Sequence, residues 1–463
     1  MGFTYMNSND ILAKTNGESL VEHTENCLRV FKSIKSAFPY LLKESGSNSL
    51  WIDLFLALLF HDTGKIAKGF QQQLKSKSKY KWSYRHEILS ASILLSSDLL
   101  AENRKVIALG ILCHHKSIDI LRKEYRTSSE EGNELFRLKL SEIKEEIDYL
   151  NKYFLERVEK LSEEYLGMKL RNILLTNQLD EFVDPYKEII VPFRKNQFSF
   201  PSLKYGLFLR GLIYACDHLA SSGNSKILPQ IKFGEKVTPK NIRKFQIHCR
   251  DYIGNLMLSA PTGSGKTEAA LLWASSNIKG NERLFYVLPY TASINAMYQR
   301  FISPEKYNLS EENVGLLHGK TNQAYYKFLI DREYSSEESE QIAKNAVSLN
   351  KKIYRPIKIT TPFQLLKAFF RVKGYEILLT EMEKGVFIFD EIHAYDARTT
   401  ALILGLLGYL RKMNTKVFIM TATIPKFLKK IINEQISEIN YLRISKNSKD
   451  YAIVSKVRHK INL

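Results

Sequence analysis

The sequence has few of the features that mark membrane, secreted or disulfide-rich proteins. Its 463 residues include only four cysteines, and no two of them form a CxxC pair. Scattered cysteines argue against a zinc ribbon or a disulfide framework, and they fit a reducing cytosol. The apolar runs around residues 54–60 and 401–410 are too short to span a bilayer, and residues 1–6 lack a signal pattern. We therefore expect a cytoplasmic protein with no membrane partner.

Acidic residues are scarce relative to basic ones. The chain has 68 Lys and Arg against 49 Asp and Glu, which gives a formal net charge of +19. Such a surplus favours a polyanionic partner, and nucleic acid is the first candidate. The alternative is that a lysine-rich composition reflects genome bias. With 44% hydrophobic and 25% charged residues the chain is globular, and its length favours two or three domains.

Residues 1–222 predict an all-helical domain. Apolar residues recur at helical spacing over residues 51–60, 88–95, 106–113 and 203–219. Between them, residues 128–166 carry Glu and Lys three or four positions apart, which predicts a solvated helical hairpin. Residues 223–240 are polar and contain prolines and glycine, so we interpret them as an interdomain linker.

The pattern changes at residue 241. From there to residue 445, short apolar runs alternate with helical segments, which predicts an α/β domain built on a parallel sheet with helices on both faces. A polar helical insertion is expected at residues 320–352 and a basic C-terminal tail at 446–463. The predicted strands are 256–258, 284–288, 314–317, 357–360, 386–389, 417–420 and 439–444.

A phosphate-binding loop stands between the first of these strands and a helix. Its sequence, Ala-Pro-Thr-Gly-Ser-Gly-Lys-Thr at residues 260–267, combines two glycines with small hydroxyl residues. Backbone N–H groups at such a helix start suit phosphate oxygens. Lys266 would reach the β- and γ-phosphates, and the Thr267 hydroxyl would bind Mg²⁺. The predicted nucleotide-binding residues of the loop are Thr262, Gly263, Ser264, Gly265, Lys266 and Thr267.

Three further residues complete the predicted ATP site. Asp390 and Glu391 directly follow the buried strand 386–389. A carboxylate at the tip of that strand can hold Mg²⁺ through water, and Glu391 can orient and deprotonate the attacking water. Gln246 precedes the loop by about twenty residues, where its amide could recognise adenine. The alternative is that Gln246 is a surface residue.

In this order and spacing, residues 241–445 resemble the first motor domain of superfamily 2 (DExH-type) helicases. The resemblance implies that Gln246 recognises adenine and that Thr421 and Thr423 couple the ATP site to its surroundings. Such motors need a second RecA-like domain that supplies arginines to the transferring phosphate, and only 40 residues follow Thr423. We therefore expect half of a motor that binds ATP but hydrolyses it slowly: a fragment, a split form, or a chain completed by a separate partner chain.

The helical half contains a series of histidines with two acids. Adjacent His-Asp and His-His pairs at helix ends are unusual by chance, and imidazoles with carboxylates suit Mn, Fe, Co, Ni or Zn rather than Mg alone. Seven ligands exceed the need of one ion, so two ions that share a bridging carboxylate are expected. The candidate ligands are His23, His61, Asp62, His86, His114, His115 and Asp217.

This series resembles the H…HD…H…D signature of the HD phosphohydrolase superfamily, and the His114-His115 pair indicates its dinuclear branch. The resemblance implies two divalent transition-metal ions, Mn, Fe, Co or Ni, and a water activated for phosphodiester cleavage. Asp62 would act as the shared catalytic ligand. Lys65 would neutralise charge on the scissile phosphate; the alternative is an exposed lysine after a turn. One ion would be held by His23, His61, Asp62 and Asp217, and the other by Asp62, His86, His114 and His115.

An HD domain followed by a DExH motor resembles the type I CRISPR-associated helicase–nuclease family. That resemblance implies an antiviral, metal-dependent nuclease for single-stranded DNA, coupled to an ATP-dependent helicase motor. It also implies recruitment by an RNA-guided surveillance complex. Two alternatives stay open: an HD nucleotide phosphohydrolase with a regulatory ATP-binding domain, and a truncated, non-catalytic recruitment module.

Overall fold

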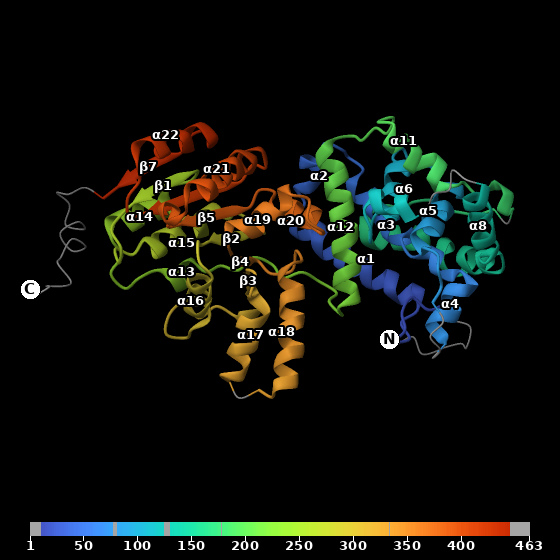
Figure 1. Cartoon of the computed structure of the whole chain (residues 1–463), viewed down its shortest axis with the longest axis horizontal. Coiled ribbons are helices and arrows are strands. Elements are labelled where there is room, and N and C mark those ends of the chain that lie inside the picture. Colours follow the sequence, from blue (N-terminus) through green and yellow to red (C-terminus); the bar gives the residue numbers. More distant parts are fainter. Residues whose placement is uncertain (1–10, 77–80, 125–129, 177, 333, 445–463) are drawn as a thin grey trace, which may run out of the picture. The chain divides into compact units, whose positions relative to one another are not determined.

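The computed structural model describes residues 11–76, 81–124, 130–176, 178–332 and 334–444 (Figure 1). The chain divides into two compact units, Met1–Lys226 (unit 1) and Ile227–Leu463 (unit 2), and each is described by itself. Within the described ranges, no helix has both the length and the apolar character needed to cross a membrane. The predicted basic tail, residues 446–463, lies outside the described residues.

Unit 1 is helical, as predicted. Its central helix α3 (Leu50–Phe60) has ten of its eleven residues buried, because the sequence is apolar on every side of the helix. Helix α12 packs against α1, α3 and α6, and α5 packs against α6. The α-helices of unit 1 are α1 (Leu20–Ala37), α2 (Leu41–Glu44), α3, α4 (Lys68–Lys75), α5 (His86–Ser96), α6 (Arg104–Leu112), α7 (Ile118–Glu124), α8 (Glu130–Ser141), α9 (Ile147–Tyr149), α10 (Val158–Leu166), α11 (Val191–Arg194) and α12 (Leu203–Ser221).

The prediction of a solvated helical hairpin at residues 128–166 is wrong over residues 130–166, the part that the structure describes. This segment is broken into α8, α9 and α10, with 3₁₀ and π turns between them. Between the charged residues, an apolar residue recurs every three or four positions, and these apolar residues form a buried stripe. The stripe consists of Phe136, Leu140, Ile143, Ile147 and Leu150.

Unit 2 contains the predicted parallel sheet, with strand order β3-β4-β2-β5-β6-β1-β7 and every described pairing parallel. Strands β3 and β4 have the predicted bounds, and the other five differ from the prediction by one residue at one or both ends. The strands are β1 (Leu256–Ser259), β2 (Leu284–Val287), β3 (Val314–Leu317), β4 (Ile357–Thr360), β5 (Val386–Asp390), β6 (Lys416–Thr421) and β7 (Asn440–Arg443).

Helices cover both faces of this sheet, so alternate strand residues enter different cores. In β1, Leu256 and Leu258 pack with one group of helices, whereas Met257 packs with the other. The first group is α13 (Gly234–Val237), α14 (Lys244–Asp251), α15 (Lys266–Asn277), α16 (Thr291–Ile302), α17 (Thr321–Ile330) and α18 (Ser336–Asn350). The second group is α19 (Pro362–Phe369), α20 (Tyr375–Met382), α21 (Ala397–Lys412) and α22 (Lys426–Gln435).

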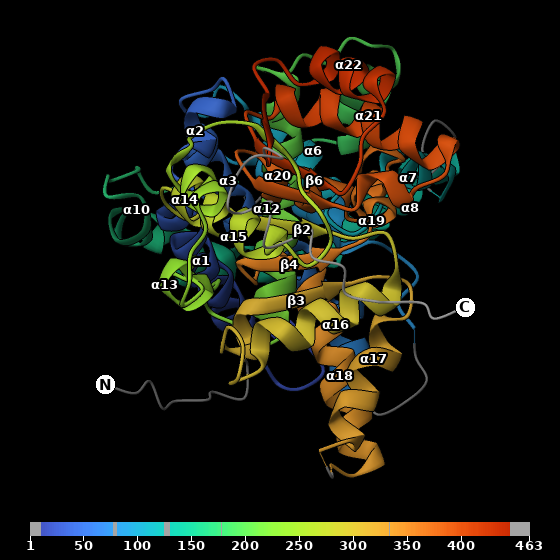
Figure 2. The same cartoon turned by 90° about the vertical axis from the view of Figure 1, so that its left-hand side faces the viewer.

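Two segments that the sequence separates from the sheet belong to unit 2. The insertion predicted at 320–352 is the helix pair α17 and α18, which pack together and extend from the sheet layers in both views (Figures 1 and 2). Most of the predicted linker, from residue 227 to residue 240, also lies in unit 2. Its Phe233 and Val237 are buried in the core beside α15.

Candidate metal centre and nucleotide site

The predicted metal ligands of unit 1 come from five places in the helical fold. His23 lies in the second turn of α1, which begins at a capping box formed by Ser19 and Glu22. His61 and Asp62 follow the end of α3, and the 3₁₀ turn η1 (Thr63–Ile66) comes directly after them. The other candidate ligands are His86 at the start of α5, His114 and His115 just after α6, and Asp217 in α12.

Gly64 allows the His61–Asp62 turn to lie directly against the start of α5. A Cβ atom at residue 64 would come within 2.1 Å of the His86 carbonyl oxygen and 2.8 Å of the Leu89 Cβ. The Gly64 N–H also donates to the Ser90 hydroxyl at 2.8 Å. This close approach brings Asp62 and His86 together, although 24 positions separate them in the sequence.

Replacing Gly64 with alanine is expected to weaken metal binding, although Gly64 is not itself a candidate ligand. The added methyl must move η1 away from α5, at a cost of about 1–3 kcal/mol of stability, and the shift separates Asp62 from His86. We expect weaker metal binding together with a lower melting temperature, measured by metal titration and calorimetry. Ser90→Ala removes the hydrogen bond without overpacking and serves as control. Unchanged metal affinity in Gly64→Ala would contradict this account.

Asp62 lies at the middle of the cluster, and its two oxygens face different histidines. Oδ2 lies 3.4 Å from the Nε2 of His23 and 3.4 Å from the Nε2 of His61. Oδ1 lies 3.2 Å from the Nε2 of His86 and 4.0 Å from the Nε2 of His114. One buried carboxylate thus joins two groups of imidazoles.

Backbone carbonyls fix the orientation of two of these rings. The Nδ1 of His61 is 2.8 Å from the Leu58 carbonyl oxygen, and the Nδ1 of His114 is 2.6 Å from that of Ile111. A carbonyl can only accept, so Nδ1 carries the proton in both rings and the lone pair stays on Nε2. Both Nε2 atoms are buried, and neither has a hydrogen-bond partner among the described residues.

Carboxylates, rather than backbone carbonyls, lie beside the Nδ1 atoms of His23 and His86. The Nδ1 of His23 faces Glu18 at 3.5 Å, and the Nδ1 of His86 faces Glu87 at 3.5 Å. Burial raises the pKa of Glu87, but the neighbouring His86 and His114 rings and the Arg85 guanidinium lower it to about 2. Such carboxylates behind imidazoles are the usual outer layer of a metal site, because they orient the ring and make it a stronger donor.

His115 and Asp217 complete the predicted set on its two sides. His115, His86 and His114 form one group whose possible ligand atoms all lie within 4.8 Å of one another. Asp217 Oδ1 is 3.3 Å from the Nε2 of His23. His115 also approaches Asp217 and His218 in a separate group of the same size. The structure therefore brings all seven predicted ligands into one cluster.

The charges of the cluster favour a bound cation. Burial lowers the pKa of His61 and of His114, and burial together with His86 lowers the pKa of His115 to about 4, which favours the neutral form of these imidazoles. Although burial opposes ionisation, His61 and Lys65 hold the pKa of Asp62 well below its usual range. Neutral imidazoles around an ionised carboxylate, with unpartnered Nε2 atoms facing inward, fit divalent transition-metal ions.

Lys65 lies at the edge of the cluster. Its side chain is buried, with 8% of the residue exposed, so the alternative of an exposed lysine is wrong. The ammonium group donates to Asp62 Oδ2 at 2.6 Å and to the Ala13 carbonyl at 3.3 Å. Lys65 is therefore the ion-pair partner of Asp62 in this structure, and its role toward a scissile phosphate stays a prediction.

Three residues beside the centre were not predicted from the sequence. Glu87 directly follows His86, His218 directly follows Asp217, and Cys27 lies one helical turn after His23. The available signal in the sequence was therefore a position next to, or one helical turn from, a predicted ligand. His218 also stacks on Tyr214, with ring centroids 3.8 Å apart.

In unit 2 the phosphate loop joins β1 to α15 as predicted. Gly263 and Gly265 have φ angles of +74° and +88°, in the region that only glycine enters freely. Thr262 is exposed, Ser264 is buried, and the Thr267 hydroxyl is hydrogen-bonded to Tyr286. Lys266 is the first residue of α15, where backbone N–H groups suit an anion. Its ammonium group donates to the Ala260 carbonyl at 3.1 Å.

The predicted acidic pair lies at the carboxyl end of β5. Asp390 Oδ2 accepts a hydrogen bond from Tyr286 at 3.0 Å, and burial and the neighbouring Glu391 raise the pKa of Asp390 to about 6. Glu391 has a φ of +51° and places its Oε1 3.6 Å from the Lys266 ammonium group. Strands β1 and β5 are both parallel to β6, which lies between them. The phosphate loop after β1 and the acidic pair at the end of β5 therefore lie at the same edge of the sheet, where the strands end.

A polar chain leads from Glu391 to the loop after β6. The Nδ1 of His393 lies 3.3 Å from Glu391 Oε2 and 2.7 Å from the Thr421 hydroxyl. That hydroxyl donates to the Thr423 carbonyl at 2.6 Å. The two threonines predicted to couple the ATP site to its surroundings are thus connected to it through His393.

Gln246 braces the phosphate loop. It is 3% exposed, so the alternative of a surface residue is wrong. Its Oε1 accepts from the Arg243 N–H at 2.9 Å, and its Nε2 donates to the Gly265 carbonyl at 3.0 Å. A Cβ at residue 265 would lie 2.4 Å from this Nε2, which is a second reason for glycine there. Adenine recognition by Gln246 stays a prediction.

Two family models match the chain, one in each unit. The model described as HD domain matches residues 20–164, and the model described as DEAD/DEAH box helicase matches residues 243–431. Together with the helical centre and the parallel sheet, they define an HD domain followed by a helicase domain.

One curated relative matches this chain across both domains, and another matches it over a shorter segment. A CRISPR-associated nuclease/helicase Cas3 of Methanothermobacter thermautotrophicus is 24% identical over 97% of this chain and 56% of its own length. A putative CRISPR-associated nuclease/helicase Cas3 of Methanocaldococcus jannaschii is 34% identical over 37% of this chain and 23% of its own length. The chain thus combines an HD domain and a helicase domain, and it is similar to Cas3 proteins. It spans little more than half of the length of the first relative and less of the second.

Solved structures show the same fold. The crystal structure of T. fusca Cas3 with AMPPNP has a TM-score of 0.53 at 15% identity and covers 94% of this chain and 51% of its own. The crystal structure of a CRISPR-associated protein has a TM-score of 0.53 at 17% identity and covers 96% of this chain and 53% of its own. The predicted fold class, a helical HD domain followed by a RecA-like sheet domain, is confirmed.

Proposed function

We propose that unit 1 is a metal-dependent nuclease whose centre holds two divalent transition-metal ions, Mn, Fe, Co or Ni. The observation that supports this most strongly is the position of Asp62, whose two oxygens face two groups of inward-directed Nε2 atoms. One ion would be held by His23, His61, Asp62 and Asp217. The other would be held by Asp62, His86, His114 and His115.

Bound there, such ions supply an activated water and stabilise the leaving oxygen of a phosphodiester. The protein's own residues hold this arrangement in place. Leu58 and Ile111 fix the proton of His61 and His114 on Nδ1 and leave Nε2 free to bind metal. Lys65 keeps Asp62 ionised and oriented, because its ammonium group contacts Oδ2 directly.

Unit 2 is proposed to bind ATP and Mg²⁺. Lys266 and the N–H groups at the start of α15 would bind phosphates, while Thr267 and Asp390 would hold Mg²⁺. Glu391 would orient the attacking water from a position beside the Lys266 ammonium group. The left-handed glycines of the loop and the buried end of β5 support this assignment.

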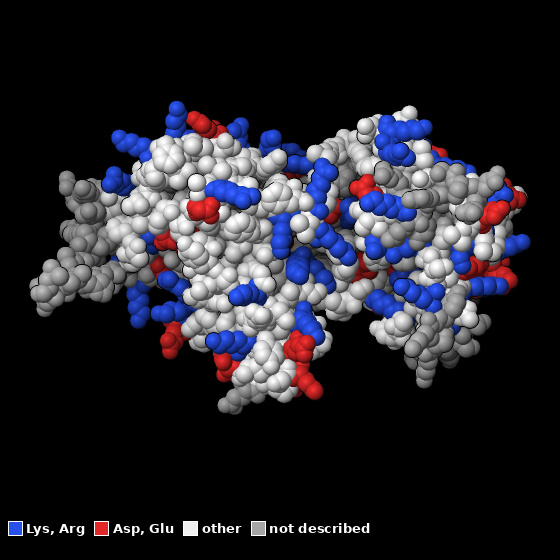
Figure 3. Space-filling view, viewed as in Figure 1, with Lys and Arg blue, Asp and Glu red and all other residues white. Residues whose placement is uncertain are grey.

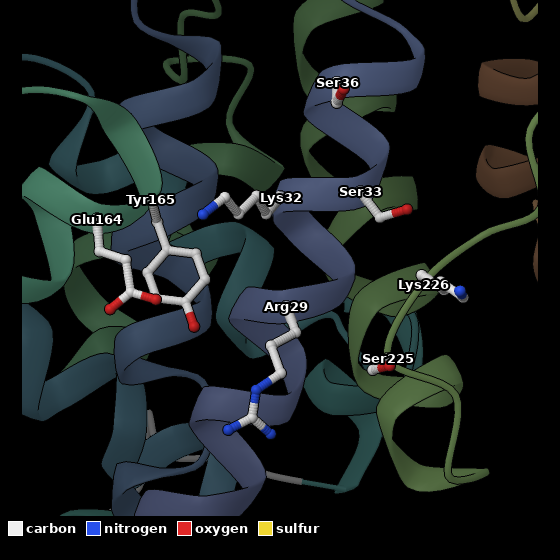
Figure 4. Close-up of a pocket in the computed structure, with 8 residues that line it drawn as sticks. All are labelled: Arg29, Lys32, Ser33, Ser36, Glu164, Tyr165, Ser225 and Lys226. Atoms are coloured by element: carbon white, nitrogen blue, oxygen red, sulfur yellow. The ribbon is translucent and has the colours of Figure 1, made fainter. Parts of the chain in front are cut away.

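Single-stranded DNA is the proposed substrate, with an RNA-guided surveillance complex as the partner that exposes it. The net charge of +19 and the surplus of basic side chains on the face shown in Figure 3 support a polyanionic partner. A pocket in unit 1, about 370 Å³ in volume, is lined by three basic side chains, Arg29 and Lys32 of α1 and Lys226, against the one acid Glu164 (Figure 4). Arg29 lies six residues after His23, or about 9 Å along the helix.

Cleavage of circular single-stranded DNA tests the proposal. We expect nicking by the full chain with Mn²⁺, Co²⁺ or Ni²⁺, weaker nicking with Mg²⁺, and none after chelation. ATP should not be needed for the first nick, because the proposed cleavage centre consists of unit 1 residues alone. Hydrolysis of free nucleotides without DNA cleavage would indicate a nucleotide phosphohydrolase instead. Absence of metal-dependent cleavage in every metal would contradict the proposal.

A further inference from the structure

The thiol of Cys27 lies inside the predicted ligand set of the first metal position. Its Sγ is 3.7 Å from the Nε2 of His23. Cys27, His23, His61 and Asp217 offer ligand atoms that all lie within 4.8 Å of one another, and all four residues are buried. Because Cys27 follows His23 by four residues in α1, both side chains lie on the same face of that helix.

The distances between these groups match those of ligands that share an ion. A nitrogen about 2.1 Å and a sulfur about 2.3 Å from one ion lie about 3.1–3.8 Å apart at ligand angles of about 90–120°, a range that includes the 3.7 Å between His23 and Cys27. His23 Nε2 is also 3.3 Å from Asp217 Oδ1. A separate observation indicates a ligand, because the buried His61 Nε2 is directed into the group and has no hydrogen-bond partner among the described residues.

We propose that Cys27 is a thiolate ligand of the ion held by His23, His61, Asp62 and Asp217. This inference rests on the proposed function, which places an ion there. When the sulfur–metal bond forms, the Cys27 S–H bond breaks and its proton passes to solvent. A soft thiolate selects Zn²⁺, Co²⁺ or Fe²⁺ over Mn²⁺ and Mg²⁺. The first position should therefore differ in metal preference from the second, whose proposed ligands are imidazoles and a carboxylate.

The proposed metal centre and the proposed Cys27 ligand can be tested separately in one experiment. Bound metal is first removed with a chelator, and the full chain is then titrated with Co²⁺ while its absorption spectrum is recorded. Visible ligand-field bands report that Co²⁺ is bound, and a near-ultraviolet sulfur-to-cobalt charge-transfer band reports a thiolate ligand. We expect both in the wild type, and Cys27→Ser should keep the visible bands but lose the charge-transfer band. Its preference for Zn²⁺ over Mn²⁺ should fall at least about 10-fold, the smallest loss usual when even an outer-layer partner is removed.

Cys216 provides the matched control, because it is also fully buried and adjoins Asp217 but lies outside the ligand group. Cys216→Ser should keep both bands, and loss of the charge-transfer band there but not in Cys27→Ser would overturn the proposal. Visible bands without charge transfer in the wild type would overturn it while leaving the metal centre intact. No visible bands at all would overturn the proposed centre itself.

A measurement on the wild type alone covers the case in which Cys27→Ser does not fold. X-ray absorption at the zinc edge of the Zn²⁺-loaded chain should show a sulfur neighbour at about 2.3 Å. A shell of nitrogen and oxygen neighbours without sulfur would overturn the proposal.

Discussion

Asp62→Ala is expected to reduce metal-dependent DNA cleavage to background. Removing a single positioned electrostatic group costs roughly 10²–10³ in kcat, and Asp62 would serve two ions, so we expect a loss of at least about 10³-fold. Both ion positions should lose affinity together, because one oxygen of Asp62 faces His23 and the other faces His86. Cleavage of circular single-stranded DNA and metal titration on the same preparation measure the two effects.

The variant also leaves Lys65 without its partner, which must be separated from the loss of metal. An unpaired buried charge costs about 3–5 kcal/mol, so Asp62→Asn and the double variant Asp62→Ala/Lys65→Met should accompany it. Asp53→Asn is the matched control, since Asp53 is equally buried in α3 and accepts hydrogen bonds from Ser49, Asn103 and Tyr205. It should keep cleavage. Cleavage at the wild-type rate by folded Asp62→Asn would contradict the shared-ligand assignment.

Lys266→Ala is expected to remove ATP binding and leave DNA nicking unchanged. A hydrogen bond to a charged group is worth about 1.5–3 kcal/mol, or roughly 10- to 150-fold in affinity, and the phosphates lose a direct charge partner as well. The proposed nuclease centre contains no residue of unit 2, so nicking without ATP should proceed at the wild-type rate. Calorimetric ATP titration and the circular-DNA assay measure the two outcomes.

Lys426→Ala, at the exposed start of α22, removes one lysine of unit 2 outside the phosphate loop and is the control. It should leave ATP affinity unchanged. If nicking disappeared in Lys266→Ala, the two sites would be coupled rather than independent. If Lys266→Ala bound ATP normally, the loop would not be the nucleotide site.

The sheet domain could be predicted closely because its signals are local. Each strand is a short apolar run next to a turn or helix signal, and the parallel sheet buries both faces of every such run. Helical segments with mixed signals were harder. Over residues 130–166 the charge pairs were conspicuous, and the apolar stripe through Leu140, Ile143 and Ile147 decided the packing instead.

The candidate ligands could be listed from the sequence, but their arrangement could not. His61-Asp62 and His114-His115 are adjacent pairs in the sequence. The two-sided position of Asp62, in contrast, depends on how His23 of α1, His86 of α5 and His114 after α6 come together at the end of α3. Cys27 carried no motif because it is a single cysteine, and only the helical turn from His23 connects it to the centre.

Side-chain partners decided the roles of Lys65 and Gln246 in the structure. Both residues could have been exposed on sequence grounds, since lysine and glutamine usually are. The structure buries both and gives each a specific partner, Asp62 for Lys65 and the Gly265 carbonyl for Gln246. Such contacts join segments far apart in the chain or across a turn, and no local pattern specifies them.

Anomalous diffraction from crystals of the full chain loaded with Mn²⁺ or Co²⁺ tests the central claim most directly. The account predicts two peaks, one on each side of Asp62. The first should lie among His23, His61 and Asp217, and the second among His86, His114 and His115. A single peak that Asp62 does not touch, or no peak in unit 1, would contradict it.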